Sequence, residues 1–184
     1  MGNFIVQATP PLVYHVTKNM RERDAQELLA VHFETDREQL ANGMALLYGD
    51  RPFTFCLGKD DEPICIITGT LMHPGLWIFG MWATDSLPKI GKMLSKFAVT
   101  ELFGAMRHVG ARRVEVRSIV GYTEVHKWLR FLGFAQGETQ KSFGKNGEDF
   151  ILFYWHEGMP WPKGYDPTAE APRSRLDNSE IKTE

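Results

Sequence analysis

The sequence lacks the features that mark membrane-spanning and exported proteins. No run of apolar residues approaches the length of about 20 that a helix needs to cross a membrane. No basic segment followed by an apolar one stands near the N-terminus, as it would in a secretory leader. We therefore expect a protein that has no membrane partner and is not secreted by a signal peptide.

Cysteine and histidine are also scarce, which limits disulfide formation and metal binding. The chain has two cysteines and six histidines among its 184 residues. Cys56 and Cys65 fall in neighbouring predicted strands, where free buried thiols are favoured over a disulfide. The histidines show no paired spacing with cysteines or carboxylates, and no Ser-His-Asp or Cys-His motif is present. We expect no metal site.

The chain carries no excess of charge of one sign. The formal net charge is −2, and no cluster of lysine and arginine falls on one predicted face. Nucleic-acid-binding surfaces usually show such a cluster, so we expect no nucleic-acid partner.

The chain is rich in apolar residues. Apolar residues make up 43% of it and aromatic residues 12%, which is enough for the core of one domain.

Composition divides the chain into three parts. Residues 1–11 are expected to form a loose lead-in, residues 12–157 one folded domain, and residues 158–184 an extended tail. The tail holds four prolines among small and charged residues and has almost no apolar periodicity. Such a composition is typical of a linker or a docking segment, not of a second domain.

Apolar periodicity predicts alternating strands and helices within the domain. The clearest period covers residues 90–109, where nine apolar residues recur at helical spacing. The other predicted helices cover 19–31, 35–48 and 123–132, and the predicted strands cover 12–16, 53–57, 64–71, 76–83, 113–120, a segment after 134, and 150–155. The order is therefore β-α-α-β-β-β-α-β-α-β-β.

The most specific pattern lies in residues 112–155. There a short helix with an apolar stripe stops at Gly133, which easily takes the left-handed conformation that ends helices. Phe134 resumes an extended chain, and two strands follow. This block resembles the C-terminal half of the GCN5-related N-acetyltransferase (GNAT) fold. It is most similar to GNAT-like proteins encoded by tailed bacteriophages and prophages.

The resemblance implies a mixed α/β fold with a seven-stranded sheet, four helices and the extended tail. Its central strands, 76–83 and 113–120, would run parallel and splay apart. In that family acetyl-CoA lies in the splay, and its diphosphate rests on the first turn of the long helix, where amide N–H groups lack partners. The matching cofactor-binding positions here are Met81, Trp82, Ala83, Lys89, Ile90, Gly91 and Lys92.

The sequence departs from the family's active pattern in two features, the diphosphate-binding motif and the general acid. The family's Arg/Gln-x-x-Gly-x-Gly/Ala motif is reduced here to Gly91, while Pro88 lacks an N–H group and Asp85 adds negative charge where phosphate would lie. The second departure is Leu129. It stands where many members of the family have a tyrosine that acts as the general acid, and leucine cannot donate a proton.

A general base should lie on or near the central strands. Asp85, His73 and Glu115 are the candidates by position, although each also fits an ordinary surface residue. Glu115 alternates with Val114 and Val116, so it faces away from them, towards solvent or towards a substrate cleft.

Two functions remain open. The degenerate loop, Leu129 and the tail favour a non-catalytic GNAT-like phage protein, located in the host cytoplasm or the virion, that needs no cofactor. It would act as a virion or virion-assembly component. Its partner, another virion protein or a second copy of the chain, would bind through the tail residues Pro160, Trp161, Pro162 and Tyr165. The alternative is an acetyl-CoA-dependent N-acetyltransferase that acts on an amine.

Overall fold

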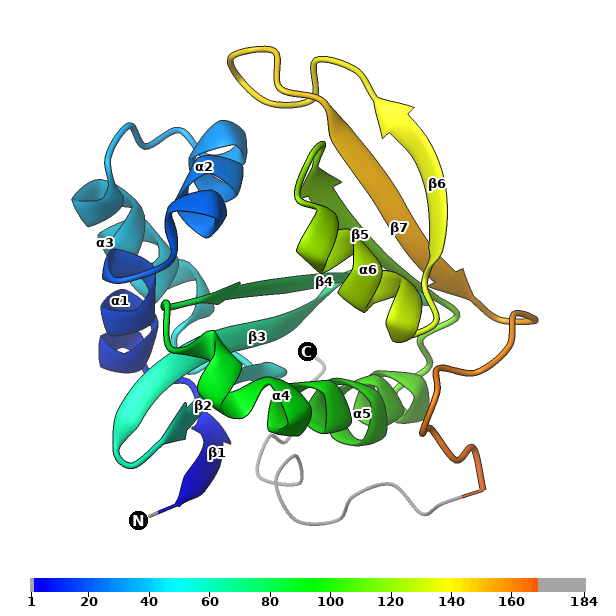
Figure 1. Ribbon diagram of the computed structural model, residues 1–184. Coiled ribbons are helices and arrows are strands. Elements are labelled where there is room, and N and C mark those ends of the chain that lie inside the picture. Colours follow the sequence, from blue (N-terminus) through cyan, green and yellow to red (C-terminus); the bar gives the residue numbers. More distant parts are fainter. Residues whose placement is uncertain (1, 169–184) are drawn as a thin grey trace.

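Residues 2–168 are described by the computed structural model, and they form one seven-stranded sheet with helices against both faces (Figure 1). The strands are β1 (Asn3–Gln7), β2 (Thr54–Lys59), β3 (Glu62–His73), β4 (Leu76–Ala83), β5 (Arg113–Ile119), β6 (Ala135–Gln140) and β7 (Phe150–His156). Their order across the sheet is β1-β2-β3-β4-β5-β7-β6. Every neighbouring pair is antiparallel except β4 and β5, so the predicted mixed α/β sheet is confirmed.

The helices are α1 (Pro10–Lys18), α2 (Glu22–Val31), α3 (Arg37–Tyr48), α4 (Gly91–Phe97), α5 (Gly104–His108) and α6 (Thr123–Phe131). A 3-10 turn, η1 (Leu87–Ile90), leads into α4, and a π-helical segment, η2 (Ala98–Phe103), joins α4 to α5 without a break. Together α4, η2 and α5 are the long helix that the apolar period predicted. Counted in this way, the described residues form five helices, one more than expected. None of them is long and apolar enough to cross a membrane.

The prediction for the N-terminal residues was wrong in two places. Residues 3–7, expected within a loose lead-in, form β1 at the edge of the sheet, antiparallel to β2. The strand expected at 12–16 lies within α1, which begins at Pro10 because proline fits the first turn of a helix. Val13 and Val16 are both buried, at the spacing of a helix and not of a strand.

The next two helices begin slightly later than the sequence indicated. The helix expected from residue 19 begins at Glu22. For α3 the predicted cap was Thr35, whereas the side chain of Asp36 accepts the hydrogen bond from Gln39 N–H at 2.9 Å. Aspartate and threonine are both good N-cap residues, so the pattern located this start to within one residue.

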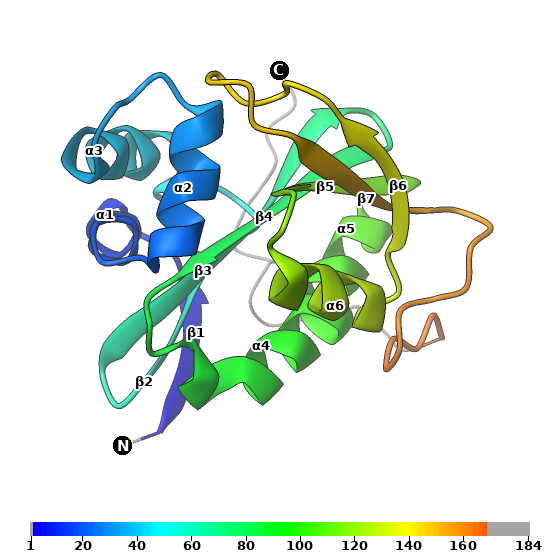
Figure 2. The ribbon, with the colours of Figure 1, turned by 45° about the horizontal axis from the view of Figure 1, so that its top comes forward.

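Helices lie on both sides of the sheet (Figure 2), and an apolar core lies under each layer of helices. The core under α1–α3 includes Leu40, Met44 and Trp82. The larger core, under the long helix and α6, includes Phe97 and Trp155. The two cysteines are free and buried as predicted. Cys65 is aligned with Leu57, the neighbour of Cys56, so the two thiols point into different cores.

The central strands diverge, as expected. β4 and β5 are paired only at Leu76–Arg113, Trp77–Val114 and Ile78–Glu115. β4 nevertheless continues to Ala83 and β5 to Ile119. We call the three aligned pairs the paired end and the rest the divergent end of these strands.

The described part of the tail, up to residue 168, lies against the chain's own domain. The Trp161 ring stacks on Trp155 with 5.2 Å between ring centroids, and the Tyr165 ring lies 5.2 Å from that of Phe103. Trp155 Nε1 donates a hydrogen bond to the carbonyl oxygen of Pro160 at 3.1 Å. Pro162 is buried. The remainder of the predicted tail, 169–184, falls outside the described residues, and partner binding through the tail stays a prediction.

Candidate active site at the divergence of β4 and β5

A cavity of about 270 Å³ occupies the divergent end of the two strands. It is lined by 78–82 of β4 and 116–118 of β5, and by side chains from α2, α3, α6 and the β6–β7 hairpin. Val31 of α2 and Phe143 of the hairpin, both among the lining residues, are 43% and 44% exposed. The cavity therefore opens to solvent between α2 and the hairpin.

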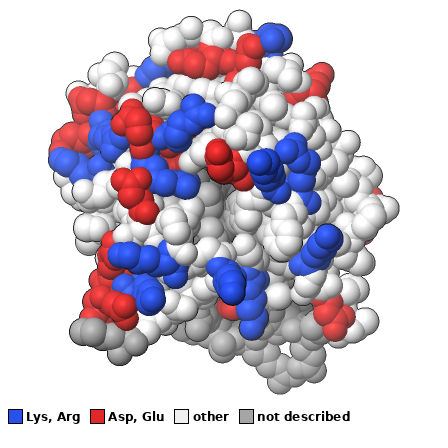
Figure 3. All heavy atoms as spheres, viewed as in Figure 1, with Lys and Arg blue, Asp and Glu red and all other residues white. Residues whose placement is uncertain are grey.

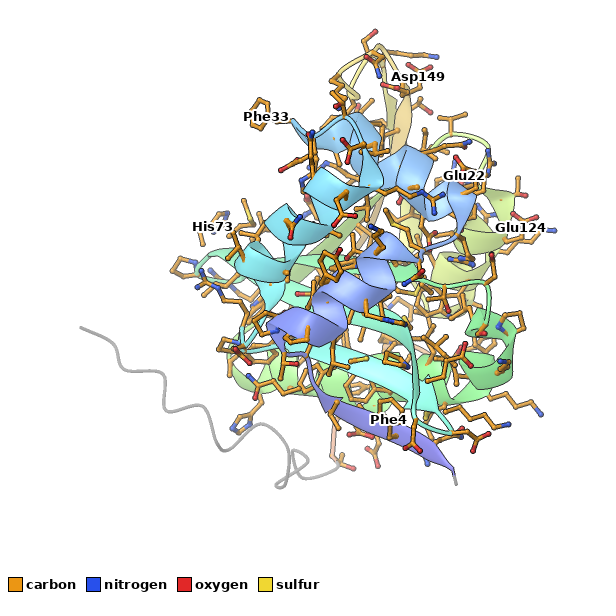
Figure 4. The ribbon with its side chains drawn as sticks, turned by 90° about the vertical axis from the view of Figure 1, so that its left-hand side faces the viewer. Phe4, Glu22, Phe33, His73, Glu124 and Asp149 are labelled. Atoms are coloured by element: carbon orange, nitrogen blue, oxygen red, sulfur yellow. The ribbon has the colours of Figure 1, made fainter. Side chains whose placement is uncertain are left out.

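The β6–β7 hairpin is fastened to the end of α2 at this opening. Lys145 Nζ donates hydrogen bonds to the carbonyl oxygens of His32 at 2.9 Å and Glu34 at 2.6 Å. The backbone N–H of Lys145 donates to the carbonyl oxygen of Ala30 at 2.8 Å. These bonds satisfy carbonyl groups that the end of a helix leaves free. Phe33, in the loop between α2 and α3, points away from the protein (Figure 4).

Alternate backbone groups of β4 face the cavity. The N–H group of Thr84 donates to the carbonyl oxygen of Ile64 in β3 at 2.8 Å. In an antiparallel ladder the backbone groups of successive residues point to opposite sides. The backbone groups of Ala83 and Met81, and the carbonyl group of Phe79, therefore point away from β3, towards the gap that β5 leaves.

Two carboxylates on α2 bind the outermost donors that the divergence sets free. Asp24 Oδ2 accepts a hydrogen bond from Ala83 N–H of β4 at 2.8 Å. Glu27 Oε2 accepts one from Ile119 N–H of β5 at 2.8 Å and one from the Ser118 hydroxyl at 2.9 Å. Residues three apart on a helix share a face, so α2 spans the open end of the gap and ties both strands to itself.

Asp24 is fully engaged with neighbouring groups. It is 4% exposed and accepts hydrogen bonds from Arg21 Nε at 3.0 Å and Arg21 Nη2 at 2.9 Å. Its Oδ1 also accepts one from the Tyr122 hydroxyl at 2.7 Å. Burial, with the adjacent Asp24 charge, raises the pKa of Tyr122 well above its ordinary value, so this phenol stays protonated. The arginine compensates the aspartate charge, and the group is structural in character.

Glu27 is different, because no cation is bonded to it. Burial raises its pKa from 4.5 to about 7, although the hydrogen bonds from Ile119 and Ser118 act in the opposite direction. Both of these bonds end on Oε2. A carboxyl group that titrates near neutral pH in a cavity is suited to accept a proton there.

Comparison with known proteins identifies the fold. No family model and no curated protein sequence matches the chain. Among solved structures, Ard1 from Thermoplasma volcanium superimposes with a TM-score of 0.63 at 10% identity, covering 85% of this chain and 98% of that one. The ribosomal-protein-S18-alanine N-acetyltransferase from Escherichia coli gives 0.57 at 14%, covering 89% and 99%. The structure of yncA from Salmonella typhimurium, solved with its cofactor acetyl-CoA, gives 0.60 at 13%, covering 89% and 99%.

The chain has the GNAT acetyltransferase fold. The GNAT resemblance inferred from residues 112–155 is therefore confirmed at the level of fold. Identities this low carry no information about the substrate. None of these neighbours indicates a bacteriophage origin or a role in a virion.

The three residues predicted as catalytic do not line the cavity. His73 lies beyond the paired end, where it is aligned with Leu76, and Figure 4 shows it projecting from the edge of the molecule. Asp85 is exposed in the turn after β4. Glu115 is bound to Arg113 at 2.6 Å and to Arg117 at 3.2 Å, so both of its carboxylate oxygens are engaged by guanidinium groups. Their catalytic roles stay predictions.

Of the residues predicted to bind the cofactor in β4, Met81 and Trp82 line the cavity. Trp82 fixes the sheet to α1, because its Nε1 donates to the Thr17 hydroxyl at 2.9 Å. Ala83 has both backbone groups engaged by α2, since its carbonyl oxygen accepts from Arg21 N–H at 2.8 Å. The backbone groups of Met81 are therefore available to a ligand in the gap, whereas those of Ala83 are already hydrogen-bonded.

In the turn from β4 into the long helix, backbone N–H groups are hydrogen-bonded within the turn itself. Leu87 N–H donates to the Thr84 carbonyl oxygen at 3.1 Å, and Lys89 N–H to that of Ser86 at 2.9 Å. Lys89 Nζ pairs with Glu62 at 2.9 Å. Of the other predicted positions Ile90 is buried, which leaves Gly91 and Lys92 in the first turn of α4 to meet an anion.

The α6 side of the cavity carries no proton donor at the predicted position. Leu129 is 1% exposed and lines the cavity, as expected for an apolar side chain there. Its neighbour Trp128 joins α6 to α4 by donating from Nε1 to the Ser95 hydroxyl at 2.9 Å. Tyr122, at the start of α6, lines the cavity and carries a hydroxyl group.

Asp24 and Glu27 were not among the residues predicted from the sequence. The available signal was a pair of acidic residues three apart on a predicted helix whose inward face holds Leu28 and Leu29. Such pairs usually lie on a solvated face. On the face of the molecule shown in Figure 3, acidic and basic side chains are interspersed, so charge alone does not single out the pair.

Proposed function

We propose that the protein is an acetyl-CoA-dependent N-acetyltransferase and that the cavity at the divergent end is its active site. The observation that supports this most directly is the divergence of β4 from β5 after three aligned pairs. It turns the backbone of Met81 and the carbonyl group of Phe79 towards a cavity that also contains a carboxyl group with a pKa of about 7.

The residues around the gap fit the extended arm of the cofactor well and its diphosphate less well. An extended arm needs backbone partners in strand geometry, and Met81 offers them together with the carbonyl group of Phe79. The diphosphate would be held by the first-turn N–H groups of the long helix, at Gly91, and by the side chain of Lys92. When bound, acetyl-CoA supplies the acetyl group as a thioester.

The chain's own residues have separable tasks in this proposal. The opening between Val31 and Phe143 admits the amine from solvent. Asp24 holds Ala83 and Tyr122 in place, and so sets the shape of the site. Glu27 lies between the opening and β5, where it can hold a proton on its carboxyl group.

Calorimetric titration with acetyl-CoA tests the proposal directly. We expect one molecule to bind per chain. The variant Val125→Trp, which fills the cavity from α6, should weaken binding by about tenfold or more because it occupies the same space. A matched control is Leu46→Trp on the exposed side of α3, which should bind as the wild type does. Absence of binding at millimolar acetyl-CoA would reject the enzyme.

A second candidate function is a non-catalytic role through protein contacts, as in a virion or virion-assembly component. The observation that favours it is the turn at residues 84–90, whose donors are bonded within the turn and whose Lys89 is paired with Glu62. In this case acetyl-CoA would not bind, and a protein partner would be retained through Trp161 and Tyr165. Titration with acetyl-CoA separates the two functions.

A further inference from the structure

The side of the cavity formed by α2, α3 and the hairpin is mainly apolar. It is lined by Leu28, Val31, Met44, Tyr48, Phe143 and Phe150. A volume of about 270 Å³ lies slightly below the range of about 300–1,000 Å³ that is usual for ligand sites. The volume and the apolar lining suit a small apolar body, and they offer few partners to a sugar or a polyamine.

The charged residues that line the cavity differ in whether they are bonded to a group of opposite charge. Asp24 is bound to Arg21. Arg117 donates from Nε to Gln140 at 3.1 Å and from Nη2 to Glu115 at 3.2 Å. Glu27 receives hydrogen bonds from neutral donors only, so among the charged residues lining the cavity in the part of the chain described it is the one without a bonded counter-ion.

We propose that Glu27 is the catalytic residue that takes the proton from the acceptor, and that the acceptor is a primary amine carried by a small apolar body. This inference rests on the proposed acetyl transfer. An ammonium group would be drawn to the uncompensated carboxylate, while its apolar substituent would lie against Leu28, Val31 and Phe143.

The proton balance of the step is complete. The acceptor ammonium gives one proton to Glu27 Oε1 and becomes a neutral amine. Its nitrogen lone pair then forms a bond to the acetyl carbon, and the carbon–sulfur bond breaks with its electron pair going to sulfur. The sulfur takes the second nitrogen proton, and Glu27 releases the first one to solvent, which restores the carboxylate.

Several groups face Glu27 and set its titration. From its own helix come Asp24, whose charge raises the pKa of Glu27, and Arg21, whose charge lowers it. From β5 come the Ile119 N–H group and the Ser118 hydroxyl, both of which lower it, and Arg117 lines the same cavity. From α6 comes Tyr122, a neutral phenol bonded to Asp24.

The first experiment measures the acceptor class with acetyl-CoA and three probes. We expect 2-phenylethylamine to be acetylated with a kcat/KM about tenfold or more above that of spermidine, since a second charge gains no partner in an apolar cavity. In a binding titration without cofactor, 2-phenylethylamine should bind more tightly than 2-phenylethanol, which has the same body and no charge. Equal use of spermidine would overturn the acceptor class.

The second experiment tests Glu27 itself. Glu27→Gln should lower kcat/KM by about 10²–10⁴-fold and abolish the rise in rate as pH increases through about 7. Its acetyl-CoA affinity should stay within about twofold of the wild type, because the amide oxygen of Gln, in the place of Glu27 Oε2, can accept both hydrogen bonds. Ser118→Ala, which removes one of the donors, should move the midpoint of the pH profile upward.

The matched control is Glu22→Gln on the same helix. Its side chain is 73% exposed and paired with Arg37, and it should leave both rate and pH profile unchanged. If Glu27→Gln retains wild-type rate and pH profile while acetyl-CoA still binds and acetyl transfer still occurs, Glu27 is not the base, although the proposed function stands. If wild-type protein binds no acetyl-CoA, the proposed function and this inference both fail.

Discussion

The paired end and the divergent end of β4 and β5 are held together by different forces. At the paired end, Trp77 and Val114 are buried, and the strand next to β5 carries Trp155, which is fully buried. The ring of Trp155 contacts those of Phe103, at 4.9 Å, and Trp161, at 5.2 Å, and these two rings also contact each other, at 6.4 Å. At the divergent end the strands are joined by Asp24 and Glu27 through α2.

The difference shows how one pair of strands serves both stability and chemistry. Where the strands stay aligned, backbone groups bond to each other and the side chains bury apolar surface. Where they part, the freed N–H groups need new partners, and this chain supplies carboxylates for the outermost ones. The divergent end therefore depends on pH, and the paired end should depend mainly on burial.

The largest effect is expected from Asp24→Ala at the divergent end. The change leaves the Arg21 guanidinium, Ala83 N–H and the Tyr122 hydroxyl without their partner. We expect the free energy of unfolding to fall by about 3–5 kcal/mol, measured by urea denaturation at pH 7. Asp36→Ala, which removes only the cap of α3, should cost about 1 kcal/mol. Equal losses would show that Asp24 does not hold this end.

Removal of the tail should destabilise the paired end next. A chain ending at Glu157 exposes the rings of Trp155 and Phe103 that Trp161 and Tyr165 cover. We expect a loss of about 2–4 kcal/mol in unfolding free energy, whereas an extended tail that did not contact the domain would contribute almost none. Trp161→Ala in the full chain should produce part of this loss. An unchanged melting temperature in both variants would contradict the packing of the tail.

Glu27→Gln should raise stability in a pH-dependent way. The pKa of Glu27 in the folded protein, about 7, lies above its ordinary value of 4.5. Between these pH values the folded state holds a proton that the unfolded state has released, so stability falls as pH rises through this window. The variant should therefore exceed the wild type by about 1–3 kcal/mol at pH 8 and match it near pH 4. Glu22→Gln should show no such gain in thermal unfolding followed across the same range.

The smallest effect concerns the turn beyond the divergent end. Hydrogen bonds from Ser86 and Lys89 lower the pKa of Glu62, and the same bonds keep Lys89 engaged. Glu62→Gln should release Lys89 and raise acetyl-CoA affinity by about two- to fivefold at low salt, with the gain lost at high salt. Glu138→Gln, on an exposed part of β6, should leave the affinity unchanged in the same calorimetric titrations.

Local patterns in the sequence determined much of the fold. The apolar period over 90–109 predicted the long helix. Gly133, predicted to stop the helix now called α6, follows it closely and has a left-handed φ of +96°. These features depend on residues close together in the chain, so periodicity and backbone preference suffice to predict them. The start of α1 was missed for a local reason too, because Pro10 and Pro11 serve equally well to end a lead-in and to begin a helix.

The two carboxylates of the candidate site were decided by tertiary structure alone. Asp24 meets Ala83, and Glu27 meets Ile119, only because the divergence of β4 and β5 frees two N–H groups at the distance that one face of α2 spans. The raised pKa of Glu27 follows from burial, which the folded chain creates. Sequence spacing carries no record of which distant strands part or of which helix covers the gap, so the chemistry of this site becomes visible only in three dimensions.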